Sequence, residues 1–266
     1  MTEDILKKIK QLPPLPESAM KIEAVYQDPN SSFNDMVKIL EKDPLLTADI
    51  LKAANSPLYG FSREINAISQ AVGLFGMGTV RGFALASIVK KSFRLNLAPY
   101  GISDAMFSEL SKKQHGLITA WCIKKENKLL GVLSPAAFLV EIGKVLIAQQ
   151  VIADGKEIEF RDALARLQDV EAAEREVVGV DTPEVSATIF KQWKFESGLI
   201  DVIGSCINPQ QAEPEAVKAA AILNVVRIAV PINGVITDES VKQAKELILK
   251  YDLDMESFDS ALENAR

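Results

Sequence analysis

The chain contains a single histidine, His115, so the side chain most often used for metal binding and acid–base catalysis occurs once in 266 residues. A nucleophilic triad or a histidine-rich metal site cannot be assembled in the usual way from one imidazole. Carboxylates alone can hold Mg²⁺, but only where two or three of them converge. Most Asp and Glu residues fall in expected first turns or on polar faces of helices, their ordinary place. We therefore interpret His115 as a partly buried residue with satisfied hydrogen bonds and not as a ligand.

A glycine-rich segment at residues 76–82 (GMGTVRG) is superficially similar to a dinucleotide-binding fingerprint. The spacing fails at the third glycine, and the preceding residues 65–75 have a helical pattern. That fingerprint binds phosphates only between a strand and a helix. We therefore expect a tight turn between two helices here, and no bound cofactor.

The charge of the chain argues against nucleic acid as the main partner. Thirty Lys and Arg residues stand against 36 Asp and Glu residues, which gives a net charge of −6. The most basic stretch, Lys90–Lys91 with Arg81 and Arg94 nearby, is short and is typical of a solvated helix end. Proteins that bind nucleic acid neutralise phosphates with a dense Lys/Arg cluster, and none occurs here.

The remaining composition predicts a cytoplasmic protein. The N-terminal sequence MTEDILKKIK has no apolar segment typical of a secretory signal. The most apolar stretch, residues 134–153, is interrupted by Glu141 and Lys144, so we expect no membrane span. Two cysteines, Cys122 and Cys206, do not form a disulfide framework and are predicted to be buried thiols.

The residue pattern predicts an all-α protein. Residues 32–35 form a capping-box pattern, and three Asp, Ser or Thr residues precede a proline in the manner of a helix N-cap: Asp43–Pro44, Ser134–Pro135 and Thr182–Pro183. A long apolar helix is expected from Pro214 to about Val230. No sustained alternation of apolar and polar residues is bounded by hairpin dipeptides, so a large sheet is not expected.

Three segments together resemble the HDOD domain: LPPLP at residues 12–16, DPLLTADILKAANSPLYG at 43–60 and INAISQAVGLFGMGTVRGFAL at 65–85. That family is an all-helical relative of the HD phosphohydrolases and is regarded as a regulatory output module of bacterial signalling proteins. The resemblance implies an HD-like multi-helix domain over residues 1–209, with N-terminal helices in 1–97 and an HD-like half in 104–209. Additional C-terminal helices in residues 210–266 are expected to pack on the same domain.

HD enzymes hydrolyse phosphoesters with one or two metal ions held by histidines and aspartates. By the resemblance, His115 falls at the first of these histidines. The other ligand positions no longer hold the histidines and aspartates of the family, and one carboxylate, that of Glu141, remains among them: Val140, Glu141, Thr182, Cys206, Ile207 and Val226. Valine cannot donate an electron pair, so the resemblance implies a degenerate, metal-free site without the ancestral catalysis. We expect these positions to pack as part of the core.

The function that follows is a non-catalytic regulatory module that binds a protein partner in bacterial signal transduction, with motility as one candidate output. The candidate partner-binding residues are those of the turn after residue 57: Leu58, Tyr59, Phe61 and Arg63. An alternative is a sensor that binds a cyclic dinucleotide or another phosphorylated small molecule in the old cleft, which arginines such as Arg227 would favour. A third is a metal-dependent phosphohydrolase with non-standard ligands. The oligomeric state is left open.

Overall fold

The computed structural model describes residues 2–59 and 63–265 of the chain, and no strand occurs in these two ranges. The all-α prediction is therefore confirmed. The chain fills most of its interior with aliphatic side chains from successive helices, in a single continuous cluster. The connections between helices are short, and several of them are single turns of 3-10 helix.

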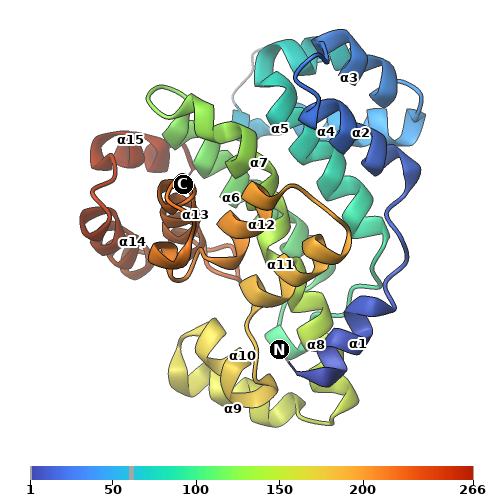
Figure 1. The fold of residues 1–266 in the computed structure, drawn as a ribbon. Coiled ribbons are helices and arrows are strands. Elements are labelled where there is room, and N and C mark those ends of the chain that lie inside the picture. Colours follow the sequence, from blue (N-terminus) through green and yellow to red (C-terminus); the bar gives the residue numbers. More distant parts are fainter. Residues whose placement is uncertain (1, 60–62, 266) are drawn as a thin grey trace.

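The first helices along the chain are α1 (Glu3–Lys10), α2 (Glu17–Gln27), α3 (Phe33–Leu40), α4 (Pro44–Ala54) and α5 (Ile68–Lys91), with the short η1 (Pro57–Tyr59) before α5. Helices α2 to α5 gather at one end of the molecule (Figure 1). Helix α1 lies apart from them and packs on α8 and α11 of the following half.

The HD-like half is built from η2 (Ala98–Tyr100), α6 (Asp104–Cys122), η3 (Asn127–Leu129), α7 (Leu130–Leu139), η4 (Val140–Ile142), α8 (Gly143–Ala153), α9 (Glu157–Leu167), α10 (Val170–Val178), α11 (Thr182–Gln192), α12 (Ser197–Gly204) and η5 (Pro209–Gln211). Helix α7 packs against both α5 and α6 and thus joins the two halves of the fold.

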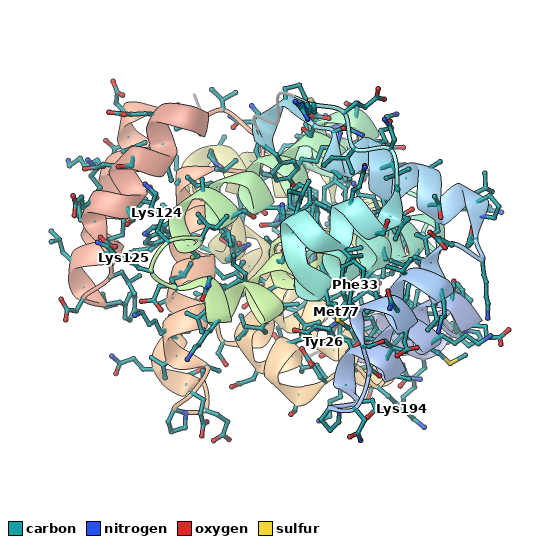
Figure 2. All side chains as sticks on the ribbon, turned by 90° about the horizontal axis from the view of Figure 1, so that it is seen from above. Tyr26, Phe33, Met77, Lys124, Lys125 and Lys194 are labelled. Atoms are coloured by element: carbon teal, nitrogen blue, oxygen red, sulfur yellow. The ribbon has the colours of Figure 1, made fainter. Side chains whose placement is uncertain are left out.

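The C-terminal helices are α13 (Val217–Ala229), α14 (Asp238–Lys250) and α15 (Met255–Ala265). Helix α15 packs on α6, where the rings of Trp121 and Phe258 lie 5.0 Å apart and the Trp121 indole donates to the Asp254 carbonyl at 2.8 Å. Figure 2 shows Lys124 and Lys125 beside these helices, and Lys125 pairs with the Asp254 carboxylate at 2.8 Å.

The helix start signals are confirmed in two places and wrong in two. The capping box at residues 32–35 forms, and the Asp43 side chain accepts from the Leu46 N–H at 3.0 Å. The N-cap of α11 is Asp181 and not Thr182, because the aspartate side chain accepts from the Glu184 N–H. Pro135 lies inside α7 and does not begin a helix.

The glycine-rich segment contains a kink at Gly76 that joins two helical stretches of α5, which agrees with the expected tight turn between two helices. Gly76 has φ +79° and ψ 163°, which breaks the helical path of α5. At the next glycine, Gly78, an added Cβ would lie 2.7 Å from the Cα of Gly131 on α7. The missing side chains allow α5 and α7 to approach closely at this point.

Helix α5 and residues 127–153 are long and apolar enough to cross a membrane by length and composition. In this fold 61% and 83%, respectively, of their most apolar windows is buried inside the molecule. Both segments therefore serve as core helices here. The two cysteines, Cys122 and Cys206, are buried and free, as the sequence predicts.

One buried arginine connects the N-terminal helices to the HD-like half. Arg81 of α5 is completely buried, and its guanidinium pairs with both oxygens of Glu23 on α2 at 2.6 and 2.8 Å. A third nitrogen donates to Glu196, just before α12, at 2.9 Å. The guanidinium also lies 4.1 Å from the ring centroid of Tyr26. Three separate segments are thus fixed by one cation.

Candidate functional site

The resemblance places the former metal centre at Glu141, which lies in η4 and is 3% exposed. Two basic side chains approach its carboxylate. Arg227 of α13 donates from Nε at 2.8 Å, and Lys144 of α8 lies with Nζ 2.8 Å from the other oxygen. Both bases are themselves buried. One displaced carboxylate is thus neutralised by cations that belong to the chain.

Helix α10 adds two further carboxylates to this group. Glu171 pairs with Arg227, and Glu174 lies 3.4 Å from the Lys144 ammonium. Glu174 also accepts from the backbone N–H and the hydroxyl of Thr182, both at 2.6 Å. We call Glu141, Lys144, Glu171, Glu174 and Arg227 the buried charge cluster.

Burial and pairing act in opposite directions on these groups. Burial alone would raise the pKa of Glu141, but the adjacent Arg227 and Lys144 outweigh it and hold that pKa below its ordinary value. Burial would lower the pKa of Lys144, and Glu141 and Glu174 reverse that effect and raise it. The cluster therefore holds a carboxylate and an ammonium in their charged forms in the interior.

The expectation that these positions pack as part of the core agrees with the burial of most of them, but the space beside them is polar. Val140, Thr182, Cys206 and Val226 are completely buried as predicted. However, the space between them holds the charge cluster, and the Thr182 hydroxyl also accepts from the Lys144 ammonium at 3.1 Å. Val226 is not the residue that reaches the site from α13, because its neighbour Arg227 does.

His115, which the resemblance assigns to the first ligand position, is not part of this group. Its preceding residue, Gln114, donates to Glu141 at 3.3 Å and to the Val230 carbonyl at 3.2 Å. Consecutive residues of a helix point about 100° apart, so a shift of one residue places the two side chains in different surroundings. The side chain of α6 that contacts the cluster is therefore Gln114 and not His115.

The His115 ring lies instead between α6, α7 and η1. Its Nδ1 is 2.5 Å from the Tyr59 hydroxyl, and its Nε2 is 2.5 Å from the Ser134 hydroxyl. The ring stacks on Phe138 with centroids 4.3 Å apart. Burial lowers the pKa of His115 to about 3, so the imidazole is neutral. The interpretation of a histidine satisfied by hydrogen bonds agrees with this geometry, although the residue is fully buried.

The neutral His115 predicts a specific acid sensitivity. Its folded pKa of about 3 lies below the unfolded value of about 6.5, so the unfolded state binds more protons between these pH values. Stability from this residue is thus lost as pH falls through that window, by about 2 kcal/mol between pH 7 and pH 5. Urea unfolding of the wild type and of His115→Phe at both pH values tests this. The variant has no imidazole at this position, so its free energy of unfolding should not show the histidine-dependent decrease. Equal losses in the two proteins would contradict it.

A cleft of about 810 Å³ opens beside the buried charge cluster, between α10, α13 and α14. Glu141, Lys144 and Arg227 form its floor, and Ile207 lines it, half-buried. The third cation of the lining, Arg175, lies 2.6 Å from the Asp181 carboxylate. Each of these three cations of the described lining is thus paired with a carboxylate of the chain.

The cluster does not fit a divalent metal ion. Within the described ranges of the chain, no three His, Cys, Asp or Glu side chains gather in a way that could hold one. The carboxylates of the cluster face basic side chains, and the Cys206 sulfur lies 3.7 Å from an Arg227 nitrogen. A metal would have to displace Arg227 and Lys144 from the same space.

Sequence reasoning missed the contributions of Lys144, Glu171 and Glu174. The available signal was spacing, because Glu141 and Lys144 are three residues apart, as are Glu171 and Glu174. That spacing puts two side chains on one face of a helix. It does not show that the two faces meet, since this depends on how α8 and α10 pack.

The turn of candidate partner-binding residues is described only in part. Residue Phe61 and the side chain of Leu58 lie outside the described part of the structure. Arg63 is exposed, as expected. Tyr59 is not a freely exposed residue, because its ring lies 5.0 Å from Phe75 and its hydroxyl contacts His115.

The chain matches the HDOD domain family over residues 12–209. It is also similar to two solved structures. A candidate phosphohydrolase from Shewanella amazonensis SB2B is 25% identical with a TM-score of 0.74, over 99% of this chain and 94% of that one. A virulence factor from Campylobacter jejuni subsp. jejuni is 27% identical with a TM-score of 0.60, over 100% and 98% of the two chains.

A curated relative is an uncharacterized protein of Treponema pallidum (strain Nichols), 29% identical over 77 residues. That match covers 29% of this chain and 15% of the length of the relative. The family match, in contrast, covers most of the chain, from the segment before α2 to the start of η5. The chain therefore belongs to the HDOD domain family.

Proposed function

We propose that this chain is a non-catalytic regulatory module that acts through a protein partner in a bacterial signalling pathway. The observation that carries the proposal is the buried charge cluster. Arg227 and Lys144 form ion pairs with the Glu141 carboxylate, which a catalytic metal would need as a ligand. The family match and the all-helical fold support a signalling role, and motility is one candidate output. The cytoplasm is the expected compartment.

The sensor alternative receives less support from the cleft. A phosphorylated ligand needs Arg or Lys side chains whose charge is available to the phosphate. The cations of the described cleft lining already pair with Glu141, Glu171, Glu174 or Asp181. A phosphate would have to compete with these carboxylates, and the fixed charges of Asp169 and Glu239 in the same lining would oppose it.

The similar Shewanella protein is named as a candidate phosphohydrolase, so phosphoester hydrolysis is an alternative function. Against hydrolysis in this chain stands the identity of the residues at the old ligand positions. Val140 has no donor atom, and Glu141 forms ion pairs with Arg227 and Lys144. We therefore propose that the fold has been retained as a scaffold for binding.

The proposed docking surface includes the exposed end of the turn at Arg63, which follows a rigid anchor. Tyr59 is held by Phe75, Phe83 and His115, so the chain is anchored at the end of η1, four residues before Arg63. Loops placed by a rigid scaffold are common interaction sites. The side chain of Arg63 is exposed, so its guanidinium can pair with a carboxylate of the partner.

Arg63→Glu is expected to reduce capture of the partner from cells of the source organism at least tenfold, because charge reversal opposes a complementary surface. The free energy of unfolding should change by less than about 0.5 kcal/mol, as is usual for an exposed position. Quantitative mass spectrometry after affinity purification measures partner capture, and urea unfolding measures the free energy of unfolding.

Arg161→Glu is the matched control for this experiment. Arg161 is exposed on α9, which lies at the opposite end of the molecule from the turn (Figure 1). Its charge reversal should leave capture unchanged. Equal capture by Arg63→Glu and the wild type, or an equal loss in both variants, would exclude Arg63 from the docking surface.

A further inference from the structure

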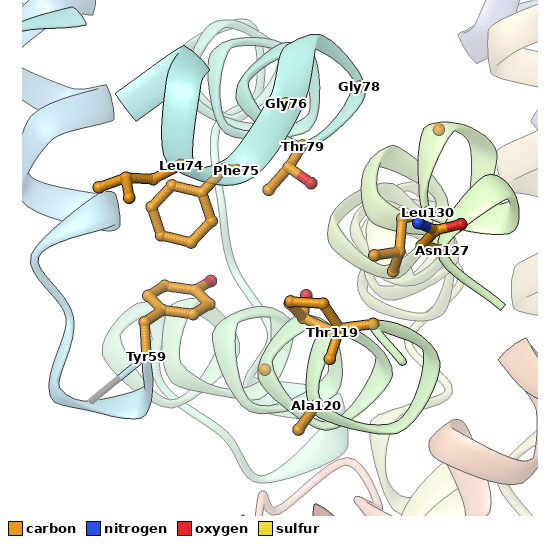
Figure 3. Close-up of a pocket in the computed structure, with 13 residues that line it drawn as sticks. Tyr59, Leu74, Phe75, Gly76, Gly78, Thr79, Thr119, Ala120, Asn127 and Leu130 are labelled. Atoms are coloured by element: carbon orange, nitrogen blue, oxygen red, sulfur yellow. The ribbon is translucent and has the colours of Figure 1, made fainter. Parts of the chain in front are cut away.

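A second hollow lies away from the buried charge cluster, between α5, α6 and α7. It has a volume of about 450 Å³, within the range of pockets that hold small molecules. Figure 3 shows Phe75 and Thr79 pointing into it from α5, with Tyr59 and Thr119 opposite and Leu130 on the α7 side.

The described lining of this pocket contains no charged side chain. Phe75 and Tyr59 form one wall, with their rings at 79° to each other. Leu74 and Ile123, which are 56% and 52% exposed, also line it. Apolar side chains are thus presented both inside the pocket and at the protein surface. This lining suits an uncharged and largely apolar ligand. An anion would lose its hydration in the pocket without gaining a cationic partner.

The lining of the pocket includes the hydroxyl of Thr79. Thr79 is 2% exposed and lines the pocket. Within residues 2–59 and 63–265, the side-chain atoms that are both sealed from solvent and unpartnered belong to Gln114 and Gln150, so the Thr79 hydroxyl is not one of them. A hydroxyl in the lining of the pocket can hydrogen-bond to a ligand that carries a donor or an acceptor.

The break in α5 adds backbone groups on the same side. Gly76 lines the pocket and departs from helical geometry, and the first N–H groups of a helix generally have no acceptor within that helix. A Cβ built on Gly76 would meet no atom within 4 Å, which shows open space at this point. The Thr79 hydroxyl lies within that same turn of the helix.

The walls of the pocket are fixed by close helix contacts. A Cβ on Gly78 would lie 2.7 Å from Gly131, and one on Gly131 would lie 2.5 Å from the Tyr26 hydroxyl. Neither helix can move inward to close the space without a clash at this crossing. The pocket is thus formed in the free protein, which lowers the free-energy cost of binding.

We propose that this pocket binds an uncharged, mainly apolar small molecule that carries one hydroxyl or comparable hydrogen-bonding group. Its apolar body lies against Phe75, Leu130 and Ile123, and its polar group meets the Thr79 hydroxyl. Because Tyr59 both lines the pocket and anchors the turn that leads to Arg63, the ligand would act on the proposed docking surface. The effect of the ligand on the docking surface rests on the proposed function, whereas binding of the ligand does not.

The test uses three compounds of one size class: toluene, phenol and phenyl phosphate. Each is titrated to about 4 mM, below the solubility of toluene in water, into protein with labelled methyl groups, and the resonances of Leu74, Ile123 and Leu130 are followed by NMR. Phenol and toluene should shift these resonances in a saturable manner, and phenyl phosphate should not. The methyl groups of Ile158, which is 77% exposed on α9, serve as the internal reference and should not move.

Two variants separate the elements of the proposal. Thr79→Val removes the hydroxyl at nearly constant volume and should weaken phenol about 3- to 10-fold, while toluene changes less than twofold. Ala120→Phe places a ring in the pocket and should abolish binding of both. Because Ala120 is only half-buried, this variant is expected to fold, and its spectrum reports that directly.

The proposal is overturned if neither neutral compound shifts the three resonances in a saturable way, or if the shifts persist in Ala120→Phe. It is also overturned if phenyl phosphate binds as well as phenol. If the compounds do not bind but a captured protein partner shifts the same methyl groups, the pocket is part of the docking surface and not a ligand site. Binding of phenol together with intact partner capture by Arg63→Glu would sustain the ligand site while removing the proposed docking residue.

Discussion

Arg227→Met is expected to lower the free energy of unfolding by about 3 to 5 kcal/mol, the usual effect of breaking a buried ion pair from one side. The substitution keeps most of the side-chain volume but leaves Glu171 and one interaction of Glu141 without a cation. Burial of these carboxylates is offset in the native protein mainly by Arg227. Urea unfolding at pH 7 gives the difference.

The pH dependence and a rescue variant show that charge is the cause. In Arg227→Met, burial without a cation raises the pKa of the remaining carboxyl groups, so the folded state takes up protons before the unfolded state does. The deficit should therefore shrink as pH falls from 7 to 5. Adding Glu171→Gln should recover part of it. A deficit below about 1 kcal/mol at pH 7 would show that the cluster is not desolvated.

Arg81→Met is expected to be comparably destabilising, by about 3 to 5 kcal/mol. It leaves Glu23, which is 7% exposed, with neither of its two short ion-pair contacts, and it also removes the contact to Glu196. Because these carboxylates come from opposite halves of the fold, both halves should lose stability. Hydrogen exchange of α2 and α12 amides measures this, together with urea unfolding.

Lys91→Met is the matched control for Arg81→Met on the same helix. Lys91 pairs with Asp49 at 2.7 Å, but the two side chains are 58% and 41% exposed. Solvent screens such a pair, so its loss should cost less than about 1 kcal/mol. Similar losses from both substitutions would contradict the role assigned to the buried arginine.

The sequence predicts the helical class because that information is local. The cap at Asp43 depends on residues a few positions apart, and the structure confirms it. Pro135 shows the limit of such signals, since proline after a serine suits the start of a helix but also occurs inside one, as in α7. At Gly76 the local signal held, because the positive φ that glycine permits separates two helical stretches of α5.

The candidate site was predictable only in part, because it depends on contacts between distant segments. The resemblance identified Glu141 as the carboxylate of the old centre. It could not show that Arg227, 86 residues later, would turn toward Glu141, whereas Val226 turns away. The same limit applies to His115, where one residue along α6 decides between the cluster and the aromatic contacts of Phe138.

The central claim is that the buried charge cluster has replaced metal-dependent phosphoester hydrolysis. The direct test is hydrolysis of 4-nitrophenyl phosphate and bis(4-nitrophenyl) phosphate by the full chain with Mg²⁺, Mn²⁺ or Fe²⁺, compared with Glu141→Gln. Circular dichroism establishes that the variant is folded. The account predicts equal, background rates for both proteins with every metal. Metal-dependent turnover by the wild type that is lost in the folded Glu141→Gln variant would contradict it.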